Sequence, residues 1–205
     1  MTAVDQPLVT ATYWGPILGF IVGAFLTFVV ERAREWFYRA KLCPDFRPDD
    51  GRCIADSSAT TSAQCRWARI SIVNRGRTYL RQCQAFVTNV EQEQSGRWIT
   101  TDPQFIDPLA LEWAATPRYT RYKPRDLPRG VEFFITIVAS TASASGAGEL
   151  TLSVDHLPDR LKTLFKPGHR YRITAIITGD KVKPKTISVI VNWTGNWNFD
   201  TSKSG

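Results

Sequence analysis

The sequence predicts an antiparallel all-β sandwich of about seven to eight strands, preceded by one N-terminal transmembrane α-helix. An uncharged apolar run extends from Trp14 to Val30 and leads into a basic stretch. After it, short runs of alternating apolar and polar residues recur, with Gly, Pro, Asn and Ser between them. The chain of 205 residues is long enough for this helix and one domain of about 150 residues.

The apolar run WGPILGFIVGAFLTFVV is about as long as a helix must be to cross a hydrocarbon core of about 30 Å. Tyr13 and Trp14 lie at one end of it, and Trp36, Phe37 and Tyr38 lie beyond the other, where interfacial aromatic residues are found. The alternative is a cleaved signal peptide. No Lys or Arg precedes the run, however, and no A-x-A-like cleavage site follows it.

The charges that flank the run predict the orientation of the helix. Asp5 is the only charged residue before Glu31. The downstream flank carries the basic residues Arg32, Arg34, Arg39 and Lys41. Because basic flanks stay in the cytoplasm, we expect an inner-membrane protein with its N-terminus outside and its C-terminal domain cytoplasmic. The alternative is a periplasmic or extracellular domain.

Small residues form a stripe along the predicted helix. Gly15, Gly19 and Gly23 recur at every fourth position, with Thr27 next in register. Such stripes let two helix backbones approach closely in a membrane. We therefore expect helix–helix packing, either in a homo-oligomer or with a partner membrane subunit. The alternative is that Gly is simply common in membrane helices.

Seven runs predict the strands of the domain: 68–74, 83–90, 109–113, 131–139, 149–154, 170–178 and 186–193. Residues 157–165 predict at most a turn of helix, and STASASGAG (140–148) predicts a flexible loop. The predicted organisation is a tail (1–12), a transmembrane helix with a juxtamembrane extension (13–42), a linker or first loop (43–65), the sandwich (66–199) and a C-terminal tail (200–205).

The run LFKPGHRYRITAII resembles the corner between strands E and F of fibronectin type III and related immunoglobulin-like sandwiches. In those domains a Leu and a Pro-Gly turn precede a Tyr that opens the next strand. The matching residues here are Leu164, Pro167, Gly168 and Tyr171. The resemblance implies an immunoglobulin-like sandwich in which the Tyr171 hydroxyl bonds back to nearby backbone. It implies nothing about function.

The chain as a whole resembles bacterial membrane-anchored proteins of unassigned function. Those proteins pair one N-terminal helix with a sandwich that has a V-x-N-x-G start, a buried Cys soon after it and a W-x-G-x-W end. The matching residues are Val73, Asn74, Arg75, Gly76, Cys83, Trp193, Gly195 and Trp197, although Asn74 directly follows Val73 here. The resemblance implies no known activity.

The run PRYTRYKPRDLPRG (117–130) interleaves basic and aromatic residues on a predicted loop. Its candidate binding residues are Arg118, Tyr119, Arg121, Tyr122, Lys123, Arg125 and Arg129. Arginine forks suit phosphates and tyrosine rings stack on bases, so nucleic acid or a nucleotide is one candidate ligand. We favour a solvated basic surface that attracts the anionic headgroups of membrane lipid. Arg75, Arg77 and Arg81 form a second basic cluster.

The remaining candidates for chemistry are few. The cysteines Cys43, Cys53, Cys65 and Cys83 form no C-x-x-C pair and have no nearby His, so we expect no metal. A disulfide such as Cys53–Cys65 requires an oxidising compartment. His156 and His169 lie beside predicted loops, and nothing resembles a catalytic motif, so we expect no catalytic residue, no cofactor and no enzyme. We expect Trp193 and Trp197 to close one end of the sandwich, rather than to form an exposed carbohydrate or peptide platform.

These observations predict a membrane-tethered module that acts by binding, as a scaffold, a sensor or an accessory subunit of a membrane complex. The first alternative is an inner-membrane nucleic-acid or nucleotide sensor that uses residues 117–130. The second is an envelope-facing adhesion or carbohydrate-binding module.

Overall fold

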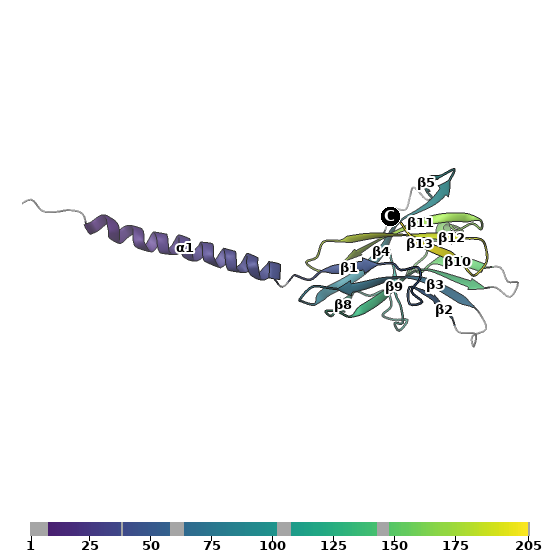
Figure 1. Ribbon diagram of the computed structural model, residues 1–205, viewed down its shortest axis with the longest axis horizontal. Helices are drawn as coiled ribbons and strands as arrows, with labels where there is room; N and C mark the ends of the chain where they lie inside the picture. The colour runs from purple at the N-terminus through teal and green to yellow at the C-terminus, as the bar shows by residue number, and fades with distance from the viewer. Residues whose placement is uncertain (1–7, 38, 58–63, 102–107, 143–147, 205) are drawn as a thin grey trace, which may run out of the picture. The chain divides into compact units, whose positions relative to one another are not determined.

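The computed structural model describes residues 8–37, 39–57, 64–101, 108–142 and 148–204 (Figure 1). The chain divides into two compact units, Met1–Arg39 and Ala40–Gly205. The first contains helix α1 (Leu8–Phe37), whose segment Gly15–Arg34 is long and apolar enough to cross a membrane. The helix therefore begins inside the predicted tail 1–12, and it ends before the predicted boundary at 42.

The second unit is an antiparallel β-sandwich, which confirms the predicted sandwich behind a helix. The sheets contain six and seven strands, more than the seven to eight predicted in all. The first sheet has the order β1-β3-β9-β10, with β2 on β3 and β7 on β9. Its strands are β1 (Leu42–Asp45), β2 (Ile54–Asp56), β3 (Cys65–Asn74), β7 (Glu112–Trp113), β9 (Glu132–Ala142) and β10 (Gly148–Leu152).

The second sheet has the order β13-β12-β11-β4-β5, with β6 and β8 also pairing with β4. Its strands are β4 (Leu80–Gln94), β5 (Arg97–Thr100), β6 (Leu109–Ala110), β8 (Arg125–Leu127), β11 (His169–Thr178), β12 (Lys185–Trp193) and β13 (Asp200–Lys203). Figure 1 shows the two sheets as stacked layers, with β11 and β12 in one and β3 and β9 in the other.

Strict alternation places the core between these layers. Along β11 every second residue from Tyr171 to Ile177 is buried, and β12 repeats the pattern from Ile187 to Trp193. The opposite wall includes the buried residues Ala68, Ile70, Ile72, Ile135 and Ile137. Because side chains alternate between the two faces of a strand, this spacing turns one complete apolar face inward.

A β-bulge lets β4 keep its apolar side chains inward as far as Val90. Ala175 pairs with Val87 and the preceding Thr174 pairs with Asn89, so Thr88 is the extra residue. Val87 and Val90 are both buried although they stand three positions apart. The bulge therefore resets the alternation, and it adds local twist to the strand.

The prediction of a linker or first loop at 43–65 is wrong for the residues that form β1 and β2. This segment contains most of β1 and all of β2, and Phe46 and Cys53 within it are buried. The predicted C-terminal tail, 200–205, contains β13. β1 and β13 are edge strands, where Pro44 and polar residues are tolerated because one side of the strand makes no ladder. Their composition therefore resembles that of loops.

Two smaller predictions differ from the structure, and a third, the turn of helix within 157–165, agrees with it. The run 109–113 forms two short strands, because β6 pairs with β4 of the second sheet and β7 with β9 of the first. Within 157–165 the structure has only the 3₁₀ turn Asp159–Leu161. The predicted loop 140–148 is strand at 140–142 and at Gly148, and its centre lies outside the described residues.

The side chain of Asn74 organises the end of the sandwich where the chain enters it. Its Nδ2 donates to the carbonyl oxygens of Thr78 and Leu127, at 2.7 and 3.1 Å. Its Oδ1 accepts from the backbone N–H groups of Gly76 and Lys41, at 3.0 and 3.3 Å. A fully buried amide with all four bonds ties together three segments that are distant in sequence.

Candidate functional site

The predicted basic loop, 117–130, supports the sheet beneath it. Within it β8 pairs with the start of β4. The carbonyl oxygens of Arg121 and Lys123 accept hydrogen bonds from the backbone N–H and the indole Nε1–H of Trp113, at 2.7 and 3.0 Å. The loop therefore covers a fully buried tryptophan and holds the strand that carries it.

The candidate binding side chains of this loop do not form one surface. Arg121 pairs with Glu112 at 3.3 Å, and the guanidinium of Arg125 lies 6.0 Å from the centre of the Trp113 ring. Tyr122 is half-buried, and its burial raises the pKa of the phenol. The exposed candidates are Arg118, Tyr119, Lys123 and Arg129. Of these, Arg129 lies apart from the others, in a bridge to Asn74.

The predicted corner residues lie together at the start of β11. Tyr171 is 0% exposed, and its hydroxyl accepts a hydrogen bond from the Lys166 backbone N–H at 2.6 Å. Gly168 adopts a φ of 79°, which favours glycine, and its N–H donates to the carbonyl of Trp193 at 2.8 Å. Leu164 is half-buried against the core.

The Pro-Gly corner and the C-terminal aromatic motif contact each other. A Cβ on Gly195 would lie 2.9 Å from the Cβ of Pro167, so only glycine fits beneath that ring without a shift. Trp193 is 4% exposed and its Nε1–H donates to the carbonyl of Asn196 at 2.9 Å. Trp193 is therefore part of the core, and Trp197 is half-buried.

The glycine stripe lies on the described part of α1. Within the isolated unit, a Cβ on Gly15, Gly19 or Gly23 would meet nothing within 4 Å. The Thr27 hydroxyl donates to the carbonyl of Gly23 at 2.9 Å, so it does not project freely. The stripe is thus smooth along its length, as close helix packing requires.

The histidines and cysteines are scattered. His156 is exposed, and His169 pairs with Trp193 in the β11–β12 ladder. None of the four cysteines forms a disulfide. Cys53 and Cys83 are buried, and burial raises the pKa of the Cys83 thiol to about 12. Among the residues with a described placement, no group of three or more His, Cys, Asp or Glu could hold a metal ion.

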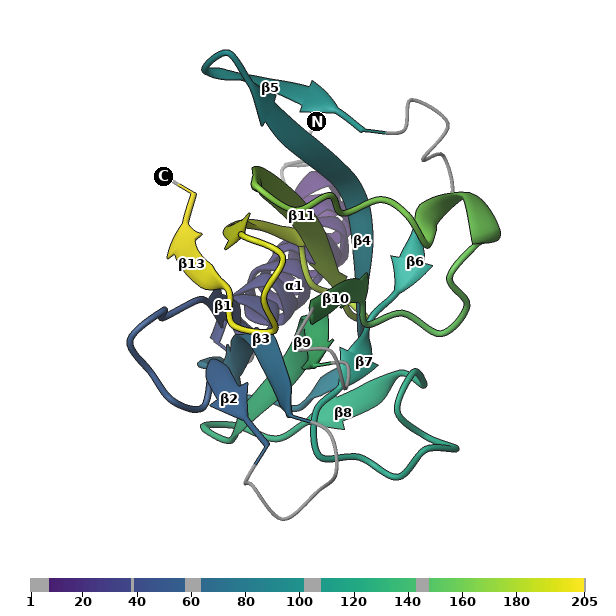
Figure 2. The same ribbon diagram turned by 90° about the vertical axis from the view of Figure 1, so that its right-hand side faces the viewer.

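Sequence analysis missed the most prominent surface feature, an arm made of the end of β4 and the whole of β5. Figure 2 shows this hairpin projecting from the rest of the sandwich. Ser95 and Gly96 turn the chain with φ values of 51° and 76°. The Ser-Gly pair in EQEQSGRWIT was the available signal, because two-residue turns with positive φ are typical of β-hairpins.

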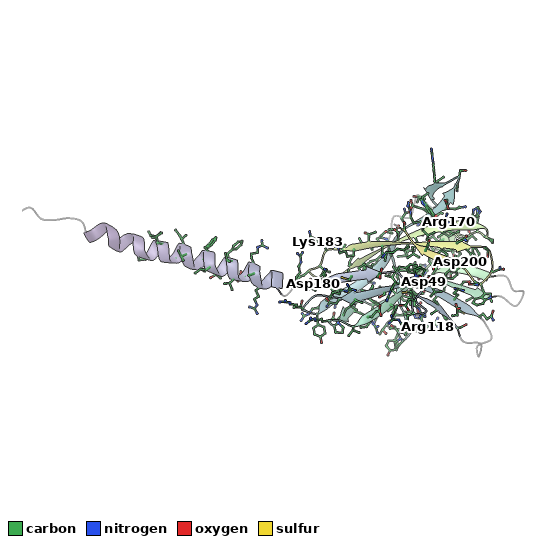
Figure 3. The ribbon with its side chains drawn as sticks, viewed as in Figure 1. Asp49, Arg118, Arg170, Asp180, Lys183 and Asp200 are labelled. Atoms are coloured by element: carbon green, nitrogen blue, oxygen red, sulfur yellow. The ribbon has the colours of Figure 1, made fainter. Side chains whose placement is uncertain are left out.

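Two arginines of β11 connect the two strands of the arm. Arg172 forms a two-point pair with the Glu91 carboxylate at 2.6 and 2.8 Å, and Arg170 pairs with Glu93 at 2.6 Å. The guanidinium of Arg172 lies 4.9 Å from the centre of the Trp98 ring, and that of Arg170 lies 5.9 Å from it. Guanidinium planes stack well on indole faces, so the two arginines clamp β5 against β4. Figure 3 labels Arg170 beside the arm.

Among the residues that the structure describes, the outer side of β5 is an open strand edge. In the described ranges β5 pairs with β4 alone. Ile99 on this strand is 47% exposed, one of few large apolar side chains that the sandwich presents to solvent. An exposed edge with unpaired backbone groups is a template for an added strand.

A comparison of the chain with protein-family models and with curated proteins finds no match.

Proposed function

We propose that this protein is a membrane-tethered, immunoglobulin-like module that acts by binding a partner protein, as a scaffold or accessory subunit of a membrane complex. The observation that carries this proposal is the arm with its open β5 edge. The apolar helix supports the tether, and the basic flank after Val30 supports a cytoplasmic domain at the inner membrane.

Strand order and the corner support the immunoglobulin-like part of the proposal. The run β12-β11-β4-β5 in the second sheet is consistent with the order G-F-C-C′. The run β1-β3-β9 in the first sheet, with β7 also pairing with β9, is consistent with A-B-E-D. Tyr171 lies at the start of the strand that corresponds to F, and its hydroxyl bonds to backbone five residues upstream. β10 is an additional strand between those that correspond to E and F.

The arm suits a partner that adds an extended segment to β5. Main-chain hydrogen bonds would then give affinity, and Ile99 would give an apolar contact for an alternate side chain. The arginine clamp orders the edge before binding, which lowers the entropy cost of association. This mode is binding without turnover, since the acidic groups of the arm are already engaged by Arg170 and Arg172.

A photo-crosslinking amino acid at Arg97 in the full chain tests the proposal in its native membrane. We expect a discrete adduct with one protein, and we expect Ile99→Lys to abolish it, because charge on an edge strand blocks strand addition. The matched control places the same crosslinker at Glu149 on β10, another edge strand with an exposed side chain.

Identical adducts from positions 97 and 149, or an adduct that survives Ile99→Lys, would contradict strand addition at the arm. An adduct with nucleic acid, lost on substitution of Arg118 and Lys123, would favour the sensor alternative. Labelling of a single engineered surface cysteine by a membrane-impermeant reagent in intact cells would favour the envelope-facing alternative.

A further inference from the structure

One end of the sandwich, here called the entry end, gathers basic side chains from four separate segments. The segments are the chain entering β1, the β3–β4 turn with the start of β4, the residues before β9, and the β11–β12 turn. Pairings place them together: Leu42 with Asn74, Asn74 with Arg129, and the Asp180 N–H on the carbonyl of Arg81 at 2.8 Å. The exposed basic residues of the entry end are Lys41, Arg75, Arg77, Arg81, Arg129, Lys181 and Lys183.

The entry end also exposes apolar surface. Tyr79 is 65% exposed and Val131 is 44% exposed, and both lie in the turns that carry the arginines. The exposed acids of the same turns are Asp126 and Asp180, and Asp126 accepts a hydrogen bond from the Gln82 N–H at 3.0 Å. A basic surface with a tyrosine and a β-branched residue among the charges is typical of segments that lie at a membrane interface.

The stretch of chain between the apolar segment and the sandwich is short. Only residues 35–41 separate the apolar segment, which ends at Arg34, from β1, which begins at Leu42. A connection of that length spans at most about 25 Å even when it is fully extended. It contains Trp36, Phe37, Tyr38, Arg39 and Lys41, with Glu35 as its one acid, so it is itself aromatic and carries a net positive charge. The predicted linker 43–65 would have removed this constraint, but it is part of the sandwich.

We infer that the entry end binds the anionic headgroups of the membrane that anchors the chain, so that the domain has a second contact with the bilayer and a fixed orientation on it. The inference rests on the membrane anchor of the proposed function. Arginine and lysine near a bilayer are attracted by anionic lipid within about a Debye length, roughly 10 Å at 0.1 M salt. Tyr79 and Val131 would enter the headgroup region.

This assignment separates two basic clusters that sequence analysis treated alike. The cluster of Arg75, Arg77 and Arg81 lies at the entry end, whereas the loop around Arg118 lies against the edge of the first sheet. Figure 3 places Arg118 well away from Lys183 and Asp180. Lipid contact at the entry end would fix the orientation of the domain on the bilayer, so the β5 edge would always face a partner from the same side.

The experiment uses the full chain in vesicles, with an environment-sensitive dye attached through a clickable phenylalanine analogue at Tyr79. We expect a blue shift of the dye when phosphatidylglycerol is added to phosphatidylcholine vesicles, and we expect high salt to reverse it. The matched control carries the dye at Tyr119, which is 78% exposed on the basic loop and should show no shift.

Charge reversal identifies the surface. The triple variant Arg75→Glu, Arg81→Glu, Lys183→Glu should lose the shift, whereas Arg118→Glu, Lys123→Glu, Lys166→Glu, with the same net charge, should keep it. All six side chains are exposed, and Arg81 and Lys166 bond to Asp180 and Tyr171 through their backbone atoms, so the substitutions should preserve the fold.

A dye at Tyr79 that does not respond to anionic lipid, in a chain that resists carbonate extraction, would overturn the headgroup contact and leave the anchor standing. A chain that carbonate extracts would overturn the anchor and both proposals. Equal loss of the dye shift in the two triple variants would show a response to net charge alone and would overturn the proposal. If the chain showed no lipid response but bound an oligonucleotide, and only the entry-end triple variant lost that binding, the surface would be assigned to nucleic acid.

Discussion

The hydroxyl of Tyr171 contacts the backbone of Lys166 twice: it accepts from the N–H at 2.6 Å and lies 3.2 Å from the carbonyl oxygen, to which it can donate. The ring of Phe165 meets the tyrosine edge-on, with centroids 4.9 Å apart. One fully buried side chain therefore fixes both the path and the packing of the turn that leads into β11.

Tyr171→Phe should lower the free energy of unfolding by about 1–3 kcal/mol, because it leaves the Lys166 N–H without its acceptor in a partly buried site. Urea denaturation followed by tryptophan fluorescence measures this value. Tyr119→Phe removes the same atom from an exposed ring and should change stability by less than about 0.5 kcal/mol. Equal effects of the two variants would contradict the corner interpretation.

Gly148→Ala should destabilise the sandwich by about 1–3 kcal/mol through overpacking. A Cβ at this position would lie 2.4 Å from the carbonyl carbon of Asn196 and 2.4 Å from the nitrogen of Trp197, and main chain cannot yield as a side chain can. Gly51→Ala is the control, since a Cβ there meets nothing within 4 Å. Thermal unfolding of the two variants should differ clearly, and matching melting temperatures would show that β10 moves freely.

The thiol of Cys83 should be inert in the folded protein. Burial is the main cause that raises its pKa from 9.0 to about 12, and the charge of Asp126 adds to the shift. A maleimide at neutral pH should modify Cys83 only after unfolding, as mass spectrometry of the peptides would show. Rapid modification of the native protein would mean that the start of β4 opens.

The same pKa shift predicts how stability depends on pH. The unfolded thiol ionises above about pH 9, whereas the folded thiol keeps its proton to about pH 12, so the folded state binds more protons in this window. The contribution of Cys83 is therefore complete below pH 9 and is lost as pH rises toward 12. Cys83→Ala should flatten the alkaline decline in the melting temperature, and an unchanged decline would assign it to other groups.

Gly19→Ile should abolish self-association of the chain if the stripe packs against a second copy, because the added side chain separates the two backbones. Ala24→Ile introduces the same side chain about 140° around the helix and should leave association intact. Crosslinking in mild detergent measures both. If Gly19→Ile associates as well as the parent chain, packing of two copies through this face is excluded. If the parent chain is monomeric but copurifies with another membrane protein, and Gly19→Ile loses that protein, the stripe is a heteromeric interface.

Period-2 alternation predicted the central strands well, because their inward residues are all apolar. The predicted run 170–178 became His169–Thr178, and 186–193 became Lys185–Trp193. These strands have neighbours on both sides and one face in the core, so every second residue is apolar and the pattern can be recognised from the sequence.

The strands that were missed have other determinants. β1 contains Pro44, and β13 reads DTSK, since an edge strand can be polar and still complete a ladder. β5 depends on Arg170 and Arg172, which lie far away in sequence from Trp98. The two basic clusters were separable only in three dimensions, because Arg129 belongs to the loop 117–130 in sequence but pairs with Asn74 at the entry end.

The bonds of Asn74 have a mechanical consequence. Lys41 is the residue through which the helix is joined to the sandwich, and its N–H is held by the Asn74 amide while β1 lies along β3 from Leu42 to Asp45. A force on the helix would therefore act on the sandwich first at this amide. The other hydrogen bonds of Asn74 would transmit it to the β3–β4 turn and to Leu127. The hydrogen bonds of the buried asparagine therefore distribute a force applied at one residue over three segments of the sandwich.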